Sequence, residues 1–229
     1  MYFGNFELNP GFLLIIAAVV LGLIAQSAVN GTYRRYSSVK TGRGLTGAQT
    51  ARHILDSYGL ANISVESVQG YLTDHYDPRA GVLRLSQGVY GGSSVAAVGV
   101  AAHEAGHAVQ DAMAYGPFLV RQKLVPVVRL GSQMLFPLIL GGVFMHMAEL
   151  YYIGAAIYGA ALLFQLVTLP VEFNASNRAV TYLQQSGSIT SGEIAGVRKV
   201  LNAAAMTYVA AALASLGQMV WLLMAGRRR

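Results

Sequence analysis

The segment His103-Glu104-Ala105-Gly106-His107 contains two imidazoles and a carboxylate at a spacing that could do chemistry. Residues four positions apart share one face of an α-helix, so His103 and His107 can point at the same metal ion. Glu104 lies one step around the helix, where its carboxylate can reach a water on that metal without binding the metal itself. Two histidines and an adjacent carboxylate are the minimum for zinc-assisted hydrolysis of an amide, with Glu104 as the general base.

A match to so short a pattern can arise by chance, and the surrounding residues argue against chance here. The ten residues before the motif, 93–102, are all small or apolar, which is typical of a buried active-site helix. Imidazole and carboxylate groups within such a run are costly unless a partner compensates them. We therefore expect a helix over 93–113 that carries the motif and contributes to a zinc site.

The composition of the chain indicates a membrane protein. Of its 229 residues, 54% are hydrophobic and 11% are charged, whereas a soluble domain usually has about 25% charged residues. The net charge of +6 is explained by basic residues that flank apolar segments, and no basic stripe with interleaved aromatic residues indicates a nucleic-acid surface. The chain has no cysteine, which excludes disulfides and thiolate metal sites. The lipid bilayer is an expected partner, and nucleic acid is not.

Four apolar segments are long enough to cross a bilayer, which requires about 20 residues. They cover about 11–29, 124–145, 150–169 and 200–224. The second and third are predicted to form a transmembrane hairpin over about 124–169. The first is not a cleaved signal peptide, because the residues before it include Glu7 and no lysine or arginine. We expect residues 1–229 to form a single integrated membrane unit.

Lysine and arginine are distributed unevenly between these spans, and their distribution predicts the orientation in the membrane. Residues 30–123 contain nine of them, residues 171–199 contain three, and residues 146–149 contain none. Because basic residues accumulate on the cytoplasmic side, we expect an outside amino terminus and an active site that faces the cytoplasm. A fourth full span would place Arg227–Arg229 outside, against this rule, so the last helix either spans or lies partly in the interface.

A catalytic zinc usually has three protein ligands and one open position, so the histidine pair needs a third partner. The candidates after the motif are Asp111, His146, Glu149, Glu172 and Glu193. Asp111 is one turn too far along the same helix, and His146 and Glu149 fall in the link predicted to lie outside. Glu193 follows a polar loop and is typical of a solvated helix start. Glu172 directly follows the third span on the side of the histidines, in a ligand helix predicted over 171–185, and is the expected ligand.

Residues 45–92 are expected to form a helix followed by a small β-sheet region. Thr46-Gly47-Ala48-Gln49 is typical of a capping box, and it predicts a helix that runs through about Tyr58 and is stopped by Gly59. Short strands are predicted over 63–68, 72–76 and 82–85. Between the last two, Asp74 and Asp77 are expected to cap a turn rather than to bind metal. An edge strand of this sheet could pair with an extended peptide.

Other functions fit the sequence less well. Gly42, Gly44 and Gly47 match the dinucleotide-binding pattern by letter, but no strand precedes them. A transporter or channel is disfavoured because Arg129 is the main charge within the spans and marks no ion pathway. The alternative from another class is a non-proteolytic membrane scaffold or chaperone-like subunit with a structural zinc. Glu104 argues against it, since a structural site has no use for a base.

Four segments carry a resemblance to a known family. They are 72–78 (Leu-Thr-Asp-His-Tyr-Asp-Pro), 100–108 (Val-Ala-Ala-His-Glu-Ala-Gly-His-Ala), 164–176 (Phe-Gln-Leu-Val-Thr-Leu-Pro-Val-Glu-Phe-Asn-Ala-Ser) and 200–205 (Val-Leu-Asn-Ala-Ala-Ala). Over essentially its full length, the chain resembles the YugP-type neutral zinc metallopeptidases of bacterial membranes. The resemblance implies a multi-pass zinc peptidase of the bacterial cell membrane without indicating what it cleaves.

The chain is more distantly similar to membrane gluzincins of the HtpX and CAAX-prenyl-protease type. In those proteins a membrane hairpin also separates the histidine pair from a glutamate ligand. The similarity implies His103, His107 and Glu172 as zinc ligands and Glu104 as the catalytic base. The expected fold is therefore a mainly α membrane protein, in which a zincin-like catalytic unit, made of the motif helix and a small β-sheet, merges with about four transmembrane helices.

Several further residues are candidates for supporting roles around the expected zinc. The distant relatives carry an acidic residue four positions after the ligand glutamate, where this chain has Ser176, so Asn174 or Asp111 is expected to take that role. The oxyanion of the tetrahedral intermediate needs a donor besides the metal. The candidates are His75, Tyr76, Arg178, Tyr182 and Tyr208. The expected substrates are membrane or unfolded polypeptides, and association with a second copy or with another membrane protein stays open.

Overall fold

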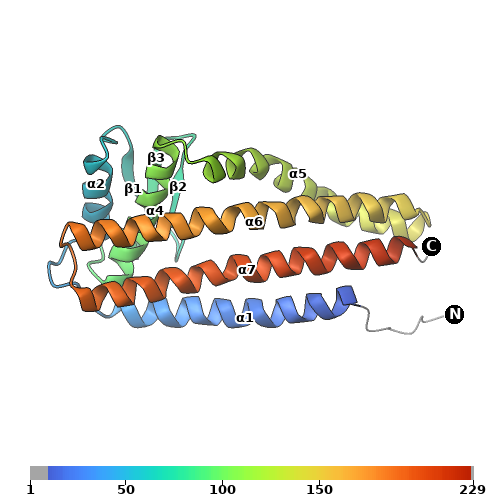
Figure 1. Cartoon of the computed structure of the whole chain (residues 1–229), viewed down its shortest axis with the longest axis horizontal. Coiled ribbons are helices and arrows are strands. Elements are labelled where there is room, and N and C mark those ends of the chain that lie inside the picture. Colours follow the sequence, from blue (N-terminus) through green and yellow to red (C-terminus); the bar gives the residue numbers. More distant parts are fainter. Residues whose placement is uncertain (1–9, 228–229) are drawn as a thin grey trace. The chain divides into compact units, whose positions relative to one another are not determined.

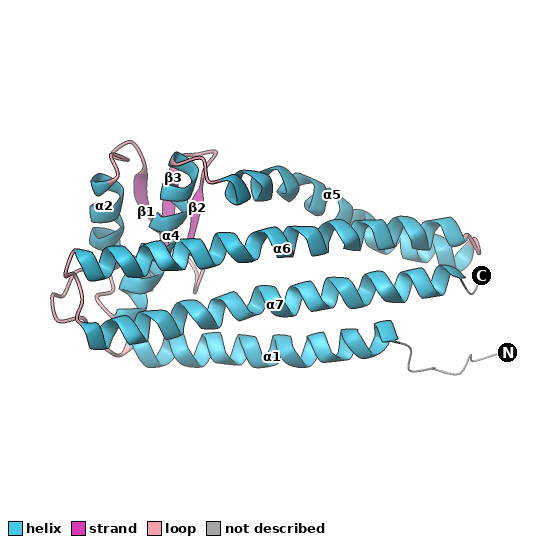
Figure 2. Cartoon of the chain, viewed as in Figure 1, coloured by secondary structure: helices cyan, strands magenta, loops and turns pink. Residues whose placement is uncertain are grey.

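The computed structural model of the protein describes residues 10–227, so Glu7, Arg228 and Arg229 lie outside the described residues. Its elements, in chain order, are α1 (Pro10–Ser37), α2 (Gly47–Ser57), β1 (Ser64–Val68), β2 (His75–Asp77), β3 (Val82–Ser86), α3 (Gln87–Tyr90), α4 (Val95–Ala112), α5 (Gly116–Phe144), α6 (Ala148–Gln185) and α7 (Ser191–Arg227) (Figure 1). Helix predominates and one small group of strands interrupts it (Figure 2). The prediction of a mainly α protein with a small sheet is confirmed.

Among residues 10–227, four helices, α1, α5, α6 and α7, are long and apolar enough to cross a membrane. Each contains one predicted span, apart from residue 145, which lies one position beyond the end of α5, and each is longer than its span. The third span and the predicted ligand helix 171–185 are one continuous helix, because α6 runs through Pro170. Proline removes one helical hydrogen bond, and membrane helices tolerate it where neighbouring groups satisfy the freed carbonyl. In the same way, α7 begins at Ser191 rather than at about residue 200.

The chain divides into two compact units. The first, called the span unit here, takes its described residues from Met1–Ala25, Val120–Thr168 and Thr207–Arg229. The second, called the site unit, comprises Gln26–Leu119 and Leu169–Met206. Each has its own cluster of buried side chains. That of the site unit is the larger, and it collects residues of α2, β3, α4, α6 and α7.

Helix α2 begins where the sequence predicts and ends at Ser57, one residue before the predicted end. The side chain of Thr46 accepts a hydrogen bond from Gln49 N (3.2 Å), and the side chain of Gln49 accepts one from Thr46 N (2.9 Å), so the capping box is present. Gly59 follows the last turn with φ +72°, a conformation that costs glycine little. The buried side chains of Ile54 and Leu55 then join the core of the site unit.

The sheet has the strand order β1-β3-β2, with β1 parallel and β2 antiparallel to β3. The central strand β3 carries Leu83 and Leu85, which are fully buried. The predicted strand 72–76 is shifted, since β2 runs from His75 to Asp77. Leu72 itself cannot belong to an extended strand, because its backbone has φ +55°. Among the described residues, the short strand β2 pairs only with β3 and is an edge strand.

The two aspartates near the turn have different roles. The carboxylate of Asp77 accepts hydrogen bonds from Arg79 N (3.0 Å) and Ala80 N (3.2 Å), so it caps the turn as predicted. Asp74 instead accepts hydrogen bonds from the backbone N–H (2.7 Å) and hydroxyl (3.0 Å) of Ser86, at the end of β3. Burial raises the pKa of Asp74, although the bonds from Ser86 act in the opposite direction. This aspartate therefore anchors the segment before β2 to β3.

Candidate metal centre

Helix α4 carries the histidine motif and lies inside the site unit. The side chain of Ser94 caps it by accepting a hydrogen bond from Ala97 N (3.1 Å), so the helix begins at Val95, two residues after the predicted start. Most side chains that precede His103 in α4 are buried. Because they are small, other elements can pack closely around this helix. The histidine motif of α4 therefore faces the interior of the site unit rather than bulk water.

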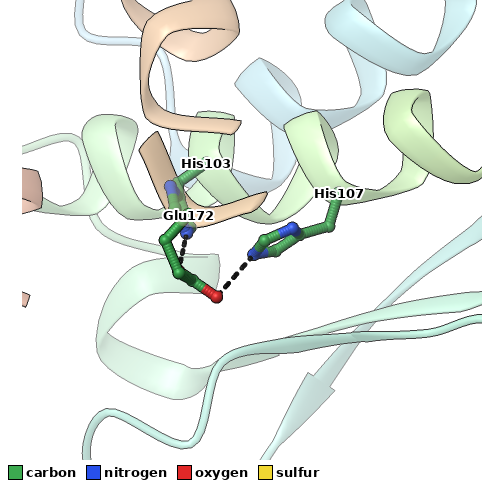
Figure 3. Close-up of side chains that lie close together, drawn as sticks. All are labelled: His103, His107 and Glu172. Atoms are coloured by element: carbon green, nitrogen blue, oxygen red, sulfur yellow. Dashed lines mark hydrogen bonds and ion pairs between the residues drawn. The ribbon is translucent and has the colours of Figure 1, made fainter. Parts of the chain in front are cut away.

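Three side chains meet at one point, two from α4 and one from α6 (Figure 3). His103 Nε2 is 3.1 Å from Glu172 Oε2, and His107 Nε2 is 3.7 Å from Glu172 Oε1. Their side chains are only 12%, 9% and 7% exposed for His103, His107 and Glu172. One donor atom from each lies within 4.8 Å of the others, an arrangement that can hold a metal ion. The structure thus places Glu172 beside the histidine pair, across 64 intervening residues.

Gly106 explains how the two helices come close enough for this contact. A Cβ atom at Gly106 would lie 2.9 Å from the carbonyl oxygen of Ala175 and 3.3 Å from its Cα. The backbones of α4 and α6 therefore approach each other at a point that any larger residue would obstruct. Gly106 lies between the two histidines, and Ala175 is one turn beyond Glu172. The close approach is thus located where the three donor groups must converge.

The donor set suits zinc. Two imidazole nitrogens and one carboxylate oxygen are ligands that zinc takes in catalytic sites, where three protein ligands leave a fourth position open. A carboxylate as buried as that of Glu172 is costly without compensating charge, and a divalent cation between it and the imidazoles would supply that charge.

The second ring nitrogen of each histidine is also occupied. His107 Nδ1 is 2.9 Å from Gln110 Oε1, and His103 Nδ1 is 3.1 Å from Ser176 Oγ. Such contacts are typical of metal-binding histidines, whose outer nitrogen is held by a hydrogen-bond partner. Sequence reasoning missed Gln110 and treated Ser176 only as a departure from a pattern. The available signal was helical spacing. Gln110 follows His107 by three residues and Ser176 follows Glu172 by four, so each lies on the same helix face as that proposed ligand.

The two residues expected to support the metal lie further out. Asn174 Oδ1 accepts hydrogen bonds from Gln110 Nε2 (3.0 Å) and Arg178 Nε (2.8 Å), so it contacts a partner of His107 rather than a histidine. Asp111 instead accepts a hydrogen bond from the hydroxyl of Tyr76 (2.9 Å). Burial, and after it the bond to Asp111, raises the pKa of Tyr76 well above its ordinary value. Tyr76 therefore remains a donor that tethers edge strand β2 to the end of α4.

The other candidate oxyanion donors and the expected base lie at separate places in the structure. His75 is exposed at the start of β2, with Nδ1 2.8 Å from Thr73 O. Arg178 donates hydrogen bonds to Asn174 Oδ1 and to the sulfur of Met113 (3.1 Å). Tyr182 packs against the core of the site unit, and Tyr208 belongs to the span unit. Glu104 directly follows His103 on α4 and is partly exposed.

Comparisons with known proteins agree with this chemistry. A family model described as "Putative neutral zinc metallopeptidase" matches residues 11–227. The chain is 48% identical over 211 residues to the Bacillus subtilis (strain 168) protein named "Putative membrane protease YugP", a match that covers 92% of this chain and 94% of that protein. No solved structure matches the chain.

Proposed function

The chain belongs to the neutral zinc metallopeptidase family, and from this premise we propose that it is a membrane-embedded endopeptidase with zinc held by His103, His107 and Glu172. The observation that carries the proposal is the convergence of these three buried side chains from α4 and α6. Glu104 directly follows His103 on α4, and its position in the motif suits a base. Membership of the family supports zinc as the metal, and the convergence of the three side chains supports them as its ligands.

Each residue has a distinct role in the proposed reaction. Zinc held by these ligands would lower the pKa of a bound water toward about 7 and would polarise the carbonyl to be cleaved. Glu104 accepts the proton of the attacking water and later delivers it to the leaving amine. Glu104 is not part of the converging group, so its carboxylate is not consumed by metal binding.

We propose that the polypeptide to be cleaved binds in an extended form along β2. Within residues 10–227 this strand pairs only with β3, so its other edge can form backbone hydrogen bonds with an added strand. The bond between Tyr76 and Asp111 keeps β2 next to the helix that carries the histidines. An extended segment without its own fold can add a strand in this way. Unfolded or membrane polypeptides are therefore the proposed substrates.

A membrane scaffold with a structural zinc is the disfavoured alternative. Structural zinc sites are closed by four ligands, most often with thiolates among them. This chain has no cysteine. Within residues 10–227, the converging group has three members. Three ligands and a neighbouring glutamate support a catalytic zinc site rather than a structural one.

Removal of zinc should therefore stop hydrolysis. The purified protein in detergent is incubated with an unfolded membrane protein before and after treatment with 1,10-phenanthroline, and the zinc content is measured in parallel. We expect cleavage to fall to background with the loss of zinc and to return when Zn²⁺ is added back. Cleavage that persists in the zinc-free protein would contradict the proposal, and full zinc occupancy without any cleavage would favour the scaffold.

We further propose that the metal centre lies at the cytoplasmic face of the membrane. The unequal distribution of lysine and arginine between the apolar helices supports this orientation. A cytoplasmic site would restrict substrates to polypeptides present in the cytoplasm or in the membrane.

Single cysteines can test this orientation, because the natural chain has none. Ala61→Cys lies in the exposed turn before β1, and Met147→Cys lies in the exposed link between α5 and α6. A membrane-impermeant thiol reagent added to intact cells should label position 147 alone, and both positions should react after lysis. Labelling of position 61 alone in intact cells would invert the orientation.

A further inference from the structure

Gln110 is a buried polar residue in α4 that the proposed reaction does not use. Its side chain has no exposed surface, and it makes three hydrogen bonds. Its Oε1 is 2.9 Å from His107 Nδ1, and its Nε2 donates to Val171 O (2.8 Å) and to Asn174 Oδ1 (3.0 Å). Both N–H groups and the oxygen are thereby satisfied, as a buried amide requires. These three bonds, called the Gln110 bridge here, join one ligand of α4 to α6.

The direction of each bond in the Gln110 bridge follows from its two ends. A backbone carbonyl such as Val171 O only accepts, so the amide group of Gln110 that faces it must be the NH₂. At the other end, Arg178 Nε only donates, so the atom of Asn174 that faces it is the oxygen, which accepts from Gln110 as well. Gln110 Oε1 is then left facing His107. Since this oxygen accepts, His107 Nδ1 must carry the proton.

The tautomer of His107 determines which of its nitrogens can bind a metal. A neutral imidazole with its proton on Nδ1 has its lone pair on Nε2. Nε2 is the nitrogen that faces Glu172 Oε1, at 3.7 Å. His107 is therefore already in the tautomer that a cation at this point needs. His103 differs, because its partner Ser176 Oγ can either donate or accept and so imposes no tautomer.

We propose that Gln110 is a positioning residue that prepares the centre before the cation binds. It holds His107 with Nε2 turned toward the metal position, and with the same amide it holds the turn of α6 that carries Glu172, since Val171 and Asn174 flank that ligand. One neutral side chain thus holds two of the three proposed ligands, His107 and Glu172, in position. The inference rests on the proposed zinc site and adds to it a residue that determines metal affinity.

The test replaces Gln110 by methionine, which has a similar length and cannot form the three bonds. The dissociation constant of Zn²⁺ is measured by competition with a chromophoric chelator. Loss of a partner that orients a ligand typically weakens metal binding by about 10- to 100-fold, and we expect a loss in this range for Gln110→Met. Val109→Ala is the matched control, because Val109 is a buried neighbour in the same helix turn that packs in the core. We expect it to keep wild-type affinity.

A second measurement separates ligand orientation from general loss of stability. Co²⁺ can replace Zn²⁺, and its visible absorption reports the geometry of the ligands. We expect the Co²⁺ spectrum of Gln110→Met to differ from that of the wild type, and that of Val109→Ala to match it. Equal Zn²⁺ affinity in the two variants, or a wild-type Co²⁺ spectrum in Gln110→Met, would overturn the inference.

Asn174→Ala keeps the test decisive if Gln110→Met does not fold. This change removes one anchor of the Gln110 bridge at a partly exposed position and leaves the bond to His107 in place. A single neutral hydrogen bond corresponds to about fivefold in an equilibrium constant, which is the expected loss of Zn²⁺ affinity. Unchanged affinity would contradict the Gln110 bridge while the proposed peptidase stands. A wild-type protein that binds no zinc would overturn both.

Discussion

Replacement of Glu104 by glutamine is expected to abolish peptide hydrolysis while the protein keeps its zinc and its fold. Glutamine has nearly the same volume but cannot accept a proton from the attacking water. Loss of a general base typically lowers the rate by about 10²- to 10⁴-fold, so turnover should fall at least this far. Zinc content should not change, because Glu104 does not belong to the group formed by His103, His107 and Glu172.

Turnover of an unfolded polypeptide, zinc content and thermal unfolding are measured together for this variant. Glu66→Gln is a matched control, since Glu66 is an exposed glutamate on β1 that lies outside the metal centre. It should retain wild-type turnover. Wild-type turnover in Glu104→Gln would show that another residue is the base, or that the hydrolysis does not occur at this centre.

Replacement of His107 by alanine should instead remove the zinc as its primary effect. One of the three proposed ligands disappears, and the buried carboxylate of Glu172 loses a neighbour. Zinc affinity should fall by more than the about 100-fold that marks the upper range for outer partners of ligands. Hydrolysis should fall with it. The paired variants therefore distinguish a ligand from a base within one motif.

Thermal unfolding gives an independent measure of the same loss. A ligand that binds only the folded state stabilises it by about 2.7 kcal/mol when its free concentration is 100 times its dissociation constant. The wild type and the control His53→Ala, an exposed histidine on α2, should gain stability when zinc is added. His107→Ala should gain little. Full zinc occupancy in His107→Ala would remove His107 from the ligand set.

The sequence determines the local features of this protein well. Helix periodicity alone places His103 and His107 on one face, and the residues around Thr46 determine where α2 begins. The apolar segments are long enough to predict all four helices that could cross a membrane. These features depend on neighbours within a few turns of helix or on the composition of one segment. They can therefore be recognised without knowledge of what packs against them.

Errors arose where packing or backbone conformation overrides such local signals. Pro170 suggested a break between a span and a ligand helix, yet α6 continues through it. Leu72 suggested the start of a strand by its alternating neighbours, yet its positive φ excludes it from an extended strand, and β2 begins at His75. In both cases a single residue type favours one conformation, and the surrounding structure selects another.

Only the tertiary structure decides how the candidate metal centre is assembled and supported. Sequence reasoning selected Glu172 as the partner of the histidine pair, but its distance from them depends on the close approach of α4 and α6 at Gly106. For Gln110 the only signal was its position three residues after His107, and a glutamine within a helix is ordinary until its contact with Val171 O, 61 residues away, is known. Contacts of this kind arise from the packing of two helices, and no pattern along either helix encodes them.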